Sequence, residues 1–252
     1  MKGVDRIAQE DLSAMHNATL NPILLLRRSF EVVGPIYWPL LILASPGFIL
    51  AIVTELTPLL GGILQLAYGI VAPILVGAAL WLVDQHLKRQ APLLGNSLNR
   101  AVSKAVPLVF ANILLVLIVL LGMPLLVLPG IYWGVRLAFA LCAIVLEDKG
   151  VTEGLGYSWN LVKGRWWGVF WALLIFGLTV VVAFLAGIFI FVFTVVVISP
   201  SAETFADRIV EAGSPVAGIA AITAVVPILN VYVVLLFRSL QQLKGQAVSY
   251  WG

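Results

Sequence analysis

Long apolar runs separated by short polar segments dominate the sequence. The runs lie at about residues 36–54, 59–83, 107–128, 130–146, 166–198 and 214–237. A helix that crosses the roughly 30 Å hydrocarbon core of a bilayer needs about 20 consecutive apolar residues. The pattern therefore predicts about six transmembrane helices, and a single all-α integral membrane domain over residues 1–252.

Two of these runs are too long for one simple span. The third and fourth form a continuous stretch with Pro129-Gly130 in its middle, a pair that marks turns, so we expect a tight helical hairpin there. The fifth run, 166–198, would be about 50 Å long as one helix at 1.5 Å per residue. It must therefore tilt, protrude or break, and Gly187 is the expected weak point.

Composition supports a membrane protein. Hydrophobic residues make up 62% of the chain and charged residues 11%, against about 45–50% and about 25% in soluble domains. This balance excludes a cytosolic enzyme, and the single cysteine, Cys142, leaves no disulfide or zinc framework. Residues 1–20 are polar where a cleavable signal peptide is apolar, so we expect no signal peptide.

The basic residues are sorted by position. Nearly all of the 15 lysines and arginines lie before the first run, between the second and third, between the fourth and fifth, or after the sixth. The alternate segments hold Arg208 and several carboxylates. Positive charge in short loops marks the cytoplasmic side, so both termini are expected in the cytoplasm. The membrane is predicted to be a bacterial cytoplasmic (inner) membrane or another internal energy-converting membrane.

Three of the basic segments contain a short amphipathic stretch that leads into an apolar run, at 25–38, 97–110 and 154–167. Each stretch predicts a helix in the headgroup plane, with its apolar side toward lipid and its cations toward anionic headgroups. The expected turns are at Pro35, Pro107 and Gly164, and the expected helix starts are Asn21-Pro22 and Thr152.

The three stretches align without gaps, which indicates a threefold internal repeat. The units would be residues 20–90, 91–150 and 151–244. The corresponding fold is three helical hairpins, each preceded by a cytoplasmic interfacial amphipathic helix. The alternative is that basic and aromatic residues gathered independently at the cytoplasmic span ends, as they do in membrane proteins generally.

Arg136 is the one basic residue expected inside a span. An intramembrane arginine costs at least about 2.5–3.5 kcal/mol unless it finds partners or reaches the interface. Two interpretations stay open. Arg136 is either a structural clamp on backbone carbonyls or a ligand or lipid-phosphate contact in a cleft, and Asn112 and Asn230 are candidates to share its environment.

The other polar candidates have structural interpretations. Asp84 and His86 end the second run, but residues two apart on a helix do not share a face, so we expect a solvated span end rather than a metal site. Glu147-Asp148 is interpreted as closing a span, with a cytoplasmic docking site as the alternative. Both histidines lie outside the apolar runs, so no cofactor is expected, although bound lipid, and pigment ligation through backbone, amide or water, stay open.

Aromatic residues and one acidic segment complete the pattern. The pairs Tyr132/Trp133 and Trp166/Trp167 are interpreted as interfacial belts at span ends. The acidic stretch 201–212 is the largest segment on the predicted outer side, and is a candidate contact with an external partner.

Residues 129–171 carry a resemblance to a known family. Their sequence, PGIYWGVRLAFALCAIVLEDKGVTEGLGYSWNLVKGRWWGVFW, combines a PGIY-type turn, an arginine in the next helix, an acidic span end, a serine-containing amphipathic helix and a Gly-Arg-aromatic re-entry. It resembles the membrane domain of some glycerophosphodiester phosphodiesterases and related stand-alone bacterial multi-pass membrane proteins. The matching positions are Pro129, Gly130, Ile131, Tyr132, Arg136, Glu147, Asp148, Ser158, Gly164, Arg165 and Trp166.

The resemblance implies a membrane domain without hydrolase activity, because the sequence lacks the catalytic phosphodiesterase domain of the fused relatives. Phosphate-loop, nucleophile-elbow and zinc-protease motifs are also missing. We expect a non-enzymatic accessory, scaffold or assembly subunit that contacts membrane lipid and membrane-protein partners or copies of itself, and no nucleic acid. The alternatives are a small transporter or lipid-handling protein with a cleft around Arg136, and an intramembrane lipid-phosphate enzyme.

Overall fold

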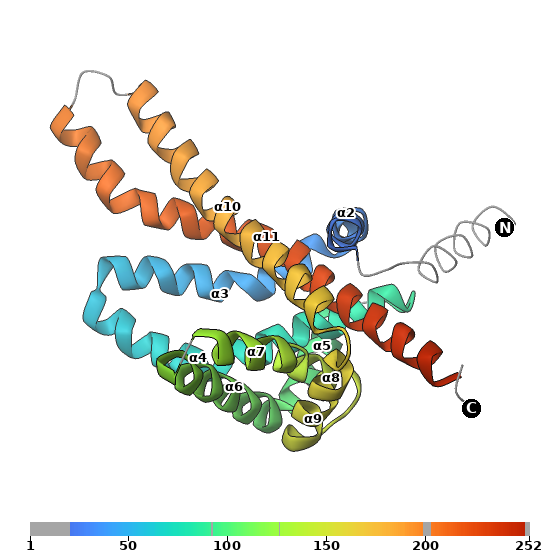
Figure 1. The fold of residues 1–252 in the computed structure, drawn as a ribbon. Coiled ribbons are helices and arrows are strands. Elements are labelled where there is room, and N and C mark those ends of the chain that lie inside the picture. The colour runs from blue at the N-terminus through green and yellow to red at the C-terminus, as the bar shows by residue number, and fades with distance from the viewer. Residues whose placement is uncertain (1–20, 92, 126, 199–202, 250–252) are drawn as a thin grey trace, which may run out of the picture.

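The protein is helical throughout the part of the chain that the structure describes. The computed structural model describes residues 21–91, 93–125, 127–198 and 203–249 (Figure 1). The elements in chain order are α2 (Pro22–Val33), η1 (Gly34–Ile36), α3 (Tyr37–Leu56), α4 (Pro58–Leu87), α5 (Leu94–Ser103), α6 (Ala105–Leu125), α7 (Val127–Leu137), α8 (Ala140–Leu146), α9 (Val151–Val162), α10 (Trp166–Ile198) and α11 (Glu203–Ser249). The predicted all-α class is confirmed.

Five helical segments are long and apolar enough to cross a membrane. They are Pro22–Thr54, Leu59–Leu87, Pro129–Leu146, Trp166–Val195 and Pro215–Gly245. A sixth span is formed if α5 and α6, which meet at a bend of 69°, are counted together. The described residues therefore show a multi-pass membrane protein with five or six candidate spans, where the sequence predicts about six.

The predicted helix starts have different outcomes. Asn21 caps α2 as expected, because its Oδ1 accepts hydrogen bonds from the backbone N–H groups of Ile23 at 3.1 Å and Leu24 at 3.3 Å. The expectation for Thr152 is wrong: α9 begins at Val151 and its N-cap is Gly150. The Gly150 N–H donates to Glu153 Oε2 at 3.4 Å, so a side chain inside the first turn satisfies this end of the helix.

Two predicted turns lie elsewhere. α7 begins at Val127, so Pro129 and Gly130 lie inside its first turn rather than between two helices. Likewise, the bend before α6 falls at Lys104, and Pro107 lies in the first turn of α6. Proline is tolerated in a first helical turn because the N–H that it lacks has no intrahelical acceptor there. The turn at Gly164 is confirmed, and its φ of +85° suits glycine.

The fourth apolar run, expected to be one helix, is divided, and the fifth, in which a break is one expectation, is continuous. The fourth run divides between Leu137 and Ala140 into α7 and α8, whereas the fifth run is one unbroken helix, α10. Of the three alternatives expected for the fifth run, a break at Gly187 is ruled out. A Cβ on Gly187 would lie 2.6 Å from the carbonyl oxygen of Ala217 and 2.6 Å from Cβ of Ala221, so this glycine allows close packing of α10 on α11.

The packed core lies at one end of the molecule, where α4, α6, α8 and α11 meet. Its fully buried side chains include Leu82, Leu108, Phe139 and Tyr232. The Tyr232 hydroxyl donates to the Ala172 carbonyl at 2.9 Å, which joins α11 to α10. Toward the other end, α10 and α11 continue as a pair to the upper left of Figure 1, apart from the turn between α3 and α4.

The Gly187 contact predicts an asymmetry between two glycines of α10. Gly187→Ala should lower the free energy of unfolding by about 1–3 kcal/mol, because the added methyl group meets the Ala217 backbone. Gly177→Ala is the matched control: its Cβ meets nothing within 4 Å, so alanine should stabilise the helix by up to ~1 kcal/mol. Unfolding of the detergent-solubilised protein measures both values, and equal effects would contradict the contact.

Candidate functional site

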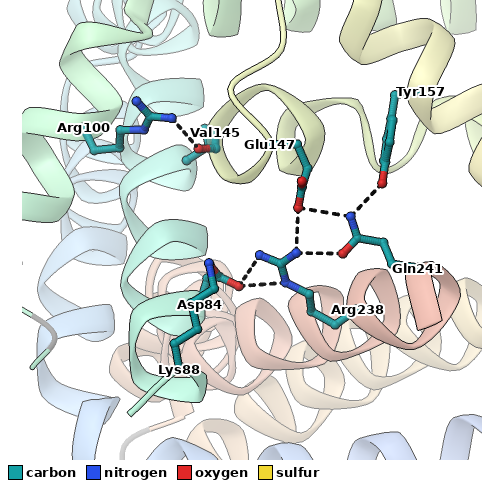
Figure 2. A network of polar contacts seen from close by, with 8 residues as sticks. All are labelled: Asp84, Lys88, Arg100, Val145, Glu147, Tyr157, Arg238 and Gln241. Atoms are coloured by element: carbon teal, nitrogen blue, oxygen red, sulfur yellow. Dashed lines mark hydrogen bonds and ion pairs between the residues drawn. The ribbon is translucent and has the colours of Figure 1, made fainter. Parts of the chain in front are cut away.

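An arginine on α11 binds two carboxylates from distant parts of the chain (Figure 2). Arg238 donates from Nη2 to Asp84 Oδ1 at 2.6 Å and from Nε to the same oxygen at 2.8 Å. Its Nη1 donates to Glu147 Oε1 at 2.6 Å and to Gln241 Oε1 at 2.7 Å. The guanidinium therefore joins α4, the end of α8, and α11 in one network.

Two further side chains complete this Arg238 network. Lys88 Nζ lies 2.7 Å from Asp84 Oδ2, and Gln241 Nε2 donates to Glu147 Oε1 at 3.0 Å and to the Tyr157 hydroxyl at 2.7 Å. The two carboxylates thus face two cations, Lys88 and Arg238. This matching is required because an unpaired charge in an apolar interior costs several kcal/mol.

Local geometry explains how the sequence builds the network. Asp84 lies in the last turn of α4, four residues before the C-cap residue Lys88, and Arg238 and Gln241 are three apart on α11, so each pair lies on one side of its helix. Glu147 follows the last turn of α8 as its C-cap. The network is therefore made of helix ends and adjacent turns rather than of a flexible loop.

The interpretation of Asp84 as part of a solvated span end is wrong. Its side chain is 1% exposed, whereas Lys88 beside it is 47% exposed. Sequence reasoning missed the site because Asp84 and Arg238 are far apart in the chain and neither has a distinctive local motif. His86 makes no metal cluster: in the described ranges, no group of three or more histidine, cysteine or acidic residues could hold a metal ion.

Asp148 forms a second ionic cluster beside the first. Its Oδ1 lies 2.7 Å from Lys104 Nζ and 2.7 Å from Arg100 Nη2. Arg100 also donates to the Val145 carbonyl at 3.3 Å and lies over the Trp81 ring. The hydrogen bond from Lys104, followed by that from Arg100, holds the pKa of Asp148 below its ordinary value of 3.8. The cluster fixes the α5–α6 bend against the end of α8, which fits the interpretation of Glu147-Asp148 as closing a span.

Arg136 contacts a different set of groups. Its Nη1 donates to the Trp159 carbonyl at 3.2 Å and its Nη2 to the Tyr132 hydroxyl at 2.7 Å. The guanidinium lies 4.6 Å from the centre of the Trp159 ring and 5.1 Å from that of Tyr132. These partners fit the interpretation of Arg136 as a clamp on a backbone carbonyl, because α7 is thereby joined to the last turn of α9.

The predicted neighbours Asn112 and Asn230 are not the hydrogen-bond partners of Arg136. Asn112 is half-buried on α6. Asn230 and Tyr68 line a separate cavity of about 250 Å³ between α3, α4 and α11. The hydrogen-bond acceptors of Arg136 are instead the Tyr132 hydroxyl and the Trp159 carbonyl.

Ser158 satisfies the backbone where the fourth run divides. Its hydroxyl donates to the Arg136 carbonyl at 2.8 Å and accepts from the Phe139 N–H at 3.1 Å, and the residue is fully buried. Breaking a helix frees backbone donors and acceptors, which need partners away from water. Ser158 of α9 therefore stabilises the break between α7 and α8.

The family-motif residues lie in several places in the fold. Tyr132, Arg136, Ser158 and Trp166 lie together around α7 and α9, and Trp166 Nε1 donates to the Tyr132 carbonyl at 3.3 Å. Glu147 and Asp148 belong to the two ionic networks. Gly164 forms the turn into α10, and Arg165 Nη2 donates to the Leu243 carbonyl at 3.4 Å. The side chains of residues 201–212, the predicted outer contact, lie outside the described part of the chain. His16 lies outside it as well.

These helices and buried charges define a multi-pass helical membrane domain. The family model for the membrane domain of glycerophosphoryl diester phosphodiesterase matches residues 108–246, more than half of the chain. The protein belongs to this family, which confirms the resemblance seen at 129–171. No curated protein and no solved structure matches the chain.

Removing Arg238 should be far more harmful than removing an exposed arginine. Arg238→Gln leaves Asp84 and Glu147 without their shared cation, and we expect a loss of ~3 kcal/mol in the free energy of unfolding. Adding Asp84→Asn should recover part of the loss, because one uncompensated carboxylate is then removed. The control is Arg27→Gln, whose exposed pair with Glu31 should contribute less than about 1 kcal/mol. Additive losses in the double variant would contradict a shared network.

The lowered pKa of Asp148 predicts a pH dependence of stability. Above the unfolded-state value of 3.8 the ionised carboxylate stabilises the folded protein through Lys104 and Arg100. As the pH falls through the lower folded-state pKa, this contribution is lost.

Asp148→Asn should therefore be less stable than the wild type at pH 6, and the difference should vanish at strongly acidic pH. Asparagine also tolerates the left-handed backbone of residue 148, whose φ is 57°. Unfolding measured across this pH range tests the prediction, with Glu31→Gln as the control. A difference that stays constant with pH would contradict it.

Proposed function

We propose that the protein is a non-enzymatic accessory or scaffold subunit of a membrane complex. The observation that supports this function is that its buried and half-buried ionisable side chains bond to other groups of the protein. Asp84 and Glu147 are bound by Arg238, and the hydrogen bonds of Arg136 go to Tyr132 and Trp159. A catalyst or carrier needs polar groups that can exchange partners with a substrate, whereas these groups hold helices together.

The exposed apolar surface of α10 supports a partner. The most apolar window of the Trp166–Val195 segment has no buried residue. Large side chains such as Leu178, Leu185 and Phe189 are 58%, 57% and 70% exposed. Lipid or another helix can cover such a face; we assign it to a helix of a partner subunit because α10 is the longest strongly apolar helix and contacts chiefly α11.

The finer arrangement in this proposal is a set of three hairpins. α3 packs on α4, α6 on α7 and α10 on α11, and a short helix precedes each pair: α2, α5 and α9. These short helices would lie at the cytoplasmic surface of the inner membrane, with both termini on that side. The common order supports, as part of the proposal, the threefold repeat of units 20–90, 91–150 and 151–244.

The two alternative functions have less support. A transporter with a cleft around Arg136 needs this side chain to be free for a substrate, yet two hydrogen bonds and two aromatic rings hold the guanidinium. A lipid-phosphate enzyme needs a general acid or base, and the carboxylates that would serve, buried Asp84 and half-buried Glu147, are ion-paired. Arg136 is therefore treated in this proposal as a positioning residue for α9.

The accessory role is tested by extracting the full chain from its native membrane in polymer nanodiscs. We expect particles that contain a second integral membrane protein at fixed stoichiometry. Gly177→Phe should lower its recovery at least about tenfold, because the added ring projects from α10 into open space. Gly69→Phe is the matched control on α4, where a Cβ also meets nothing within 4 Å, and it should retain the partner.

The outcomes separate the two parts of the proposal. Particles that contain only this chain and lipid would overturn the accessory role. A partner that is retained equally by both variants would overturn the assignment of α10 as the contact face while leaving the accessory role in place.

A further inference from the structure

An apolar groove of about 730 Å³ runs between α7 and α10. Four residues of α7, Pro129 and Ile131–Trp133, form one wall, and Trp166, Trp167 and Phe170 form the other. This volume lies within the range of sites that bind small molecules, about 300–1,000 Å³. The groove has an almost entirely apolar lining, which suits a hydrocarbon chain.

The aromatic walls are held in place by contacts of their own. The Tyr132 and Trp166 rings are stacked with centroids 5.8 Å apart, and Trp166 Nε1 donates to the Tyr132 carbonyl. Trp166 also stacks on Phe170 at 5.2 Å. Trp133 and Trp167 remain 40% and 67% exposed. The groove is thus a fixed part of the fold, with two indoles accessible to a bound molecule.

Positive charge without a carboxylate partner lies beside the groove, around the C-terminal end of α9. Arg136, Arg165 and Lys244 bond to backbone carbonyls, those of Trp159, Leu243 and Asn160 respectively. Carbonyls do not neutralise these cations. Lys163 and Arg165 are the basic residues closest in sequence to this groove wall, since Arg165 directly precedes Trp166 and only Gly164 separates it from Lys163.

The acidic residues of this region are bound elsewhere or, in the case of Glu153, lie in the first turn of α9, where Glu153 accepts from the Gly150 N–H. Within the described residues, Asp84 and Glu147 pair with Arg238, and Asp148 with Arg100 and Lys104. The end of α9 therefore carries excess positive charge next to an apolar groove. The Tyr132 hydroxyl accepts from Arg136, so its own proton is free to donate to an oxygen anion.

We propose that this groove binds an anionic phospholipid. One acyl chain lies against the aromatic walls, and the phosphate lies at Lys163 and Arg165. A free phosphate would gain nothing from the apolar groove, and a zwitterionic lipid would gain less from the uncompensated cations. This inference concerns a lipid site and does not depend on the accessory role proposed above.

Tryptophan quenching by brominated lipids tests the site. The full chain is reconstituted in vesicles of zwitterionic phospholipid that contain a small fraction of brominated anionic phospholipid. A second set contains the same fraction of brominated zwitterionic phospholipid. Trp133 and Trp167 lie in the groove and report on the bound lipid. We expect the anionic lipid to quench at a roughly 25-fold lower mole fraction, the effect of two cations at about 1 kcal/mol each.

Substitutions test which cations cause the preference for anionic over zwitterionic lipid. Lys163→Gln should weaken it about fivefold, the effect of about 1 kcal/mol per cation near an anionic lipid. Lys163→Gln with Arg165→Gln should abolish it. Arg27→Gln with Arg28→Gln removes two charges from α2 and should leave it unchanged. Trp133→Phe with Trp167→Phe should remove most of the anion-specific quenching.

Three results would overturn the proposal. The first is equal quenching of the wild-type protein by the two lipids. The second is an unchanged preference in Lys163→Gln, an exposed position whose substitution does not depend on Arg165 or its backbone contact. The third is an equal loss in the α2 control, which would assign the preference to general surface charge.

Discussion

The ion pairs of Arg238 are the interaction on which the arrangement of the helices depends. Asp84 is removed from solvent almost completely, and its charge is stable there only because Arg238 and Lys88 lie against it. The desolvation of such a group costs several kcal/mol, so the helices that carry the partners cannot separate cheaply. The ion pairs of Arg238 join three helices: α11, α4 through Asp84, and α8 through Glu147 at its end. Apolar contacts alone are not directional and would fix the relative positions of these helices less strictly.

The division of the fourth apolar run follows from the same constraint applied to backbone groups. A helix that stops inside a membrane domain exposes donors and acceptors that lipid cannot satisfy. Ser158 binds one acceptor and one donor on either side of the break, and Arg136 binds a carbonyl on α9 in return. α9 is therefore attached to α7 by reciprocal hydrogen bonds, which explains why Ser158 of α9 is fully buried.

The sequence predicts most of the helices well, because their signal is local. The fifth run has the same bounds as α10, and Asn21 caps the helix expected after it. The turns predicted at Pro129 and Pro107 are misplaced, because proline is also acceptable in the first turn of a helix. Asp84 is misinterpreted since its partner is 154 residues away along the chain. Charge periodicity near a span end does not distinguish a solvated carboxylate from a buried one.

The position of Asp84 has a consequence for the boundaries of the fold. The family model spans residues 108–246, which includes Glu147 and Arg238 but not Asp84, Lys88 or Arg100. The matched segment therefore holds only part of the Arg238 network. A piece cut at residue 108 would keep the arginine of α11 and lose its most buried counter-ion, Asp84.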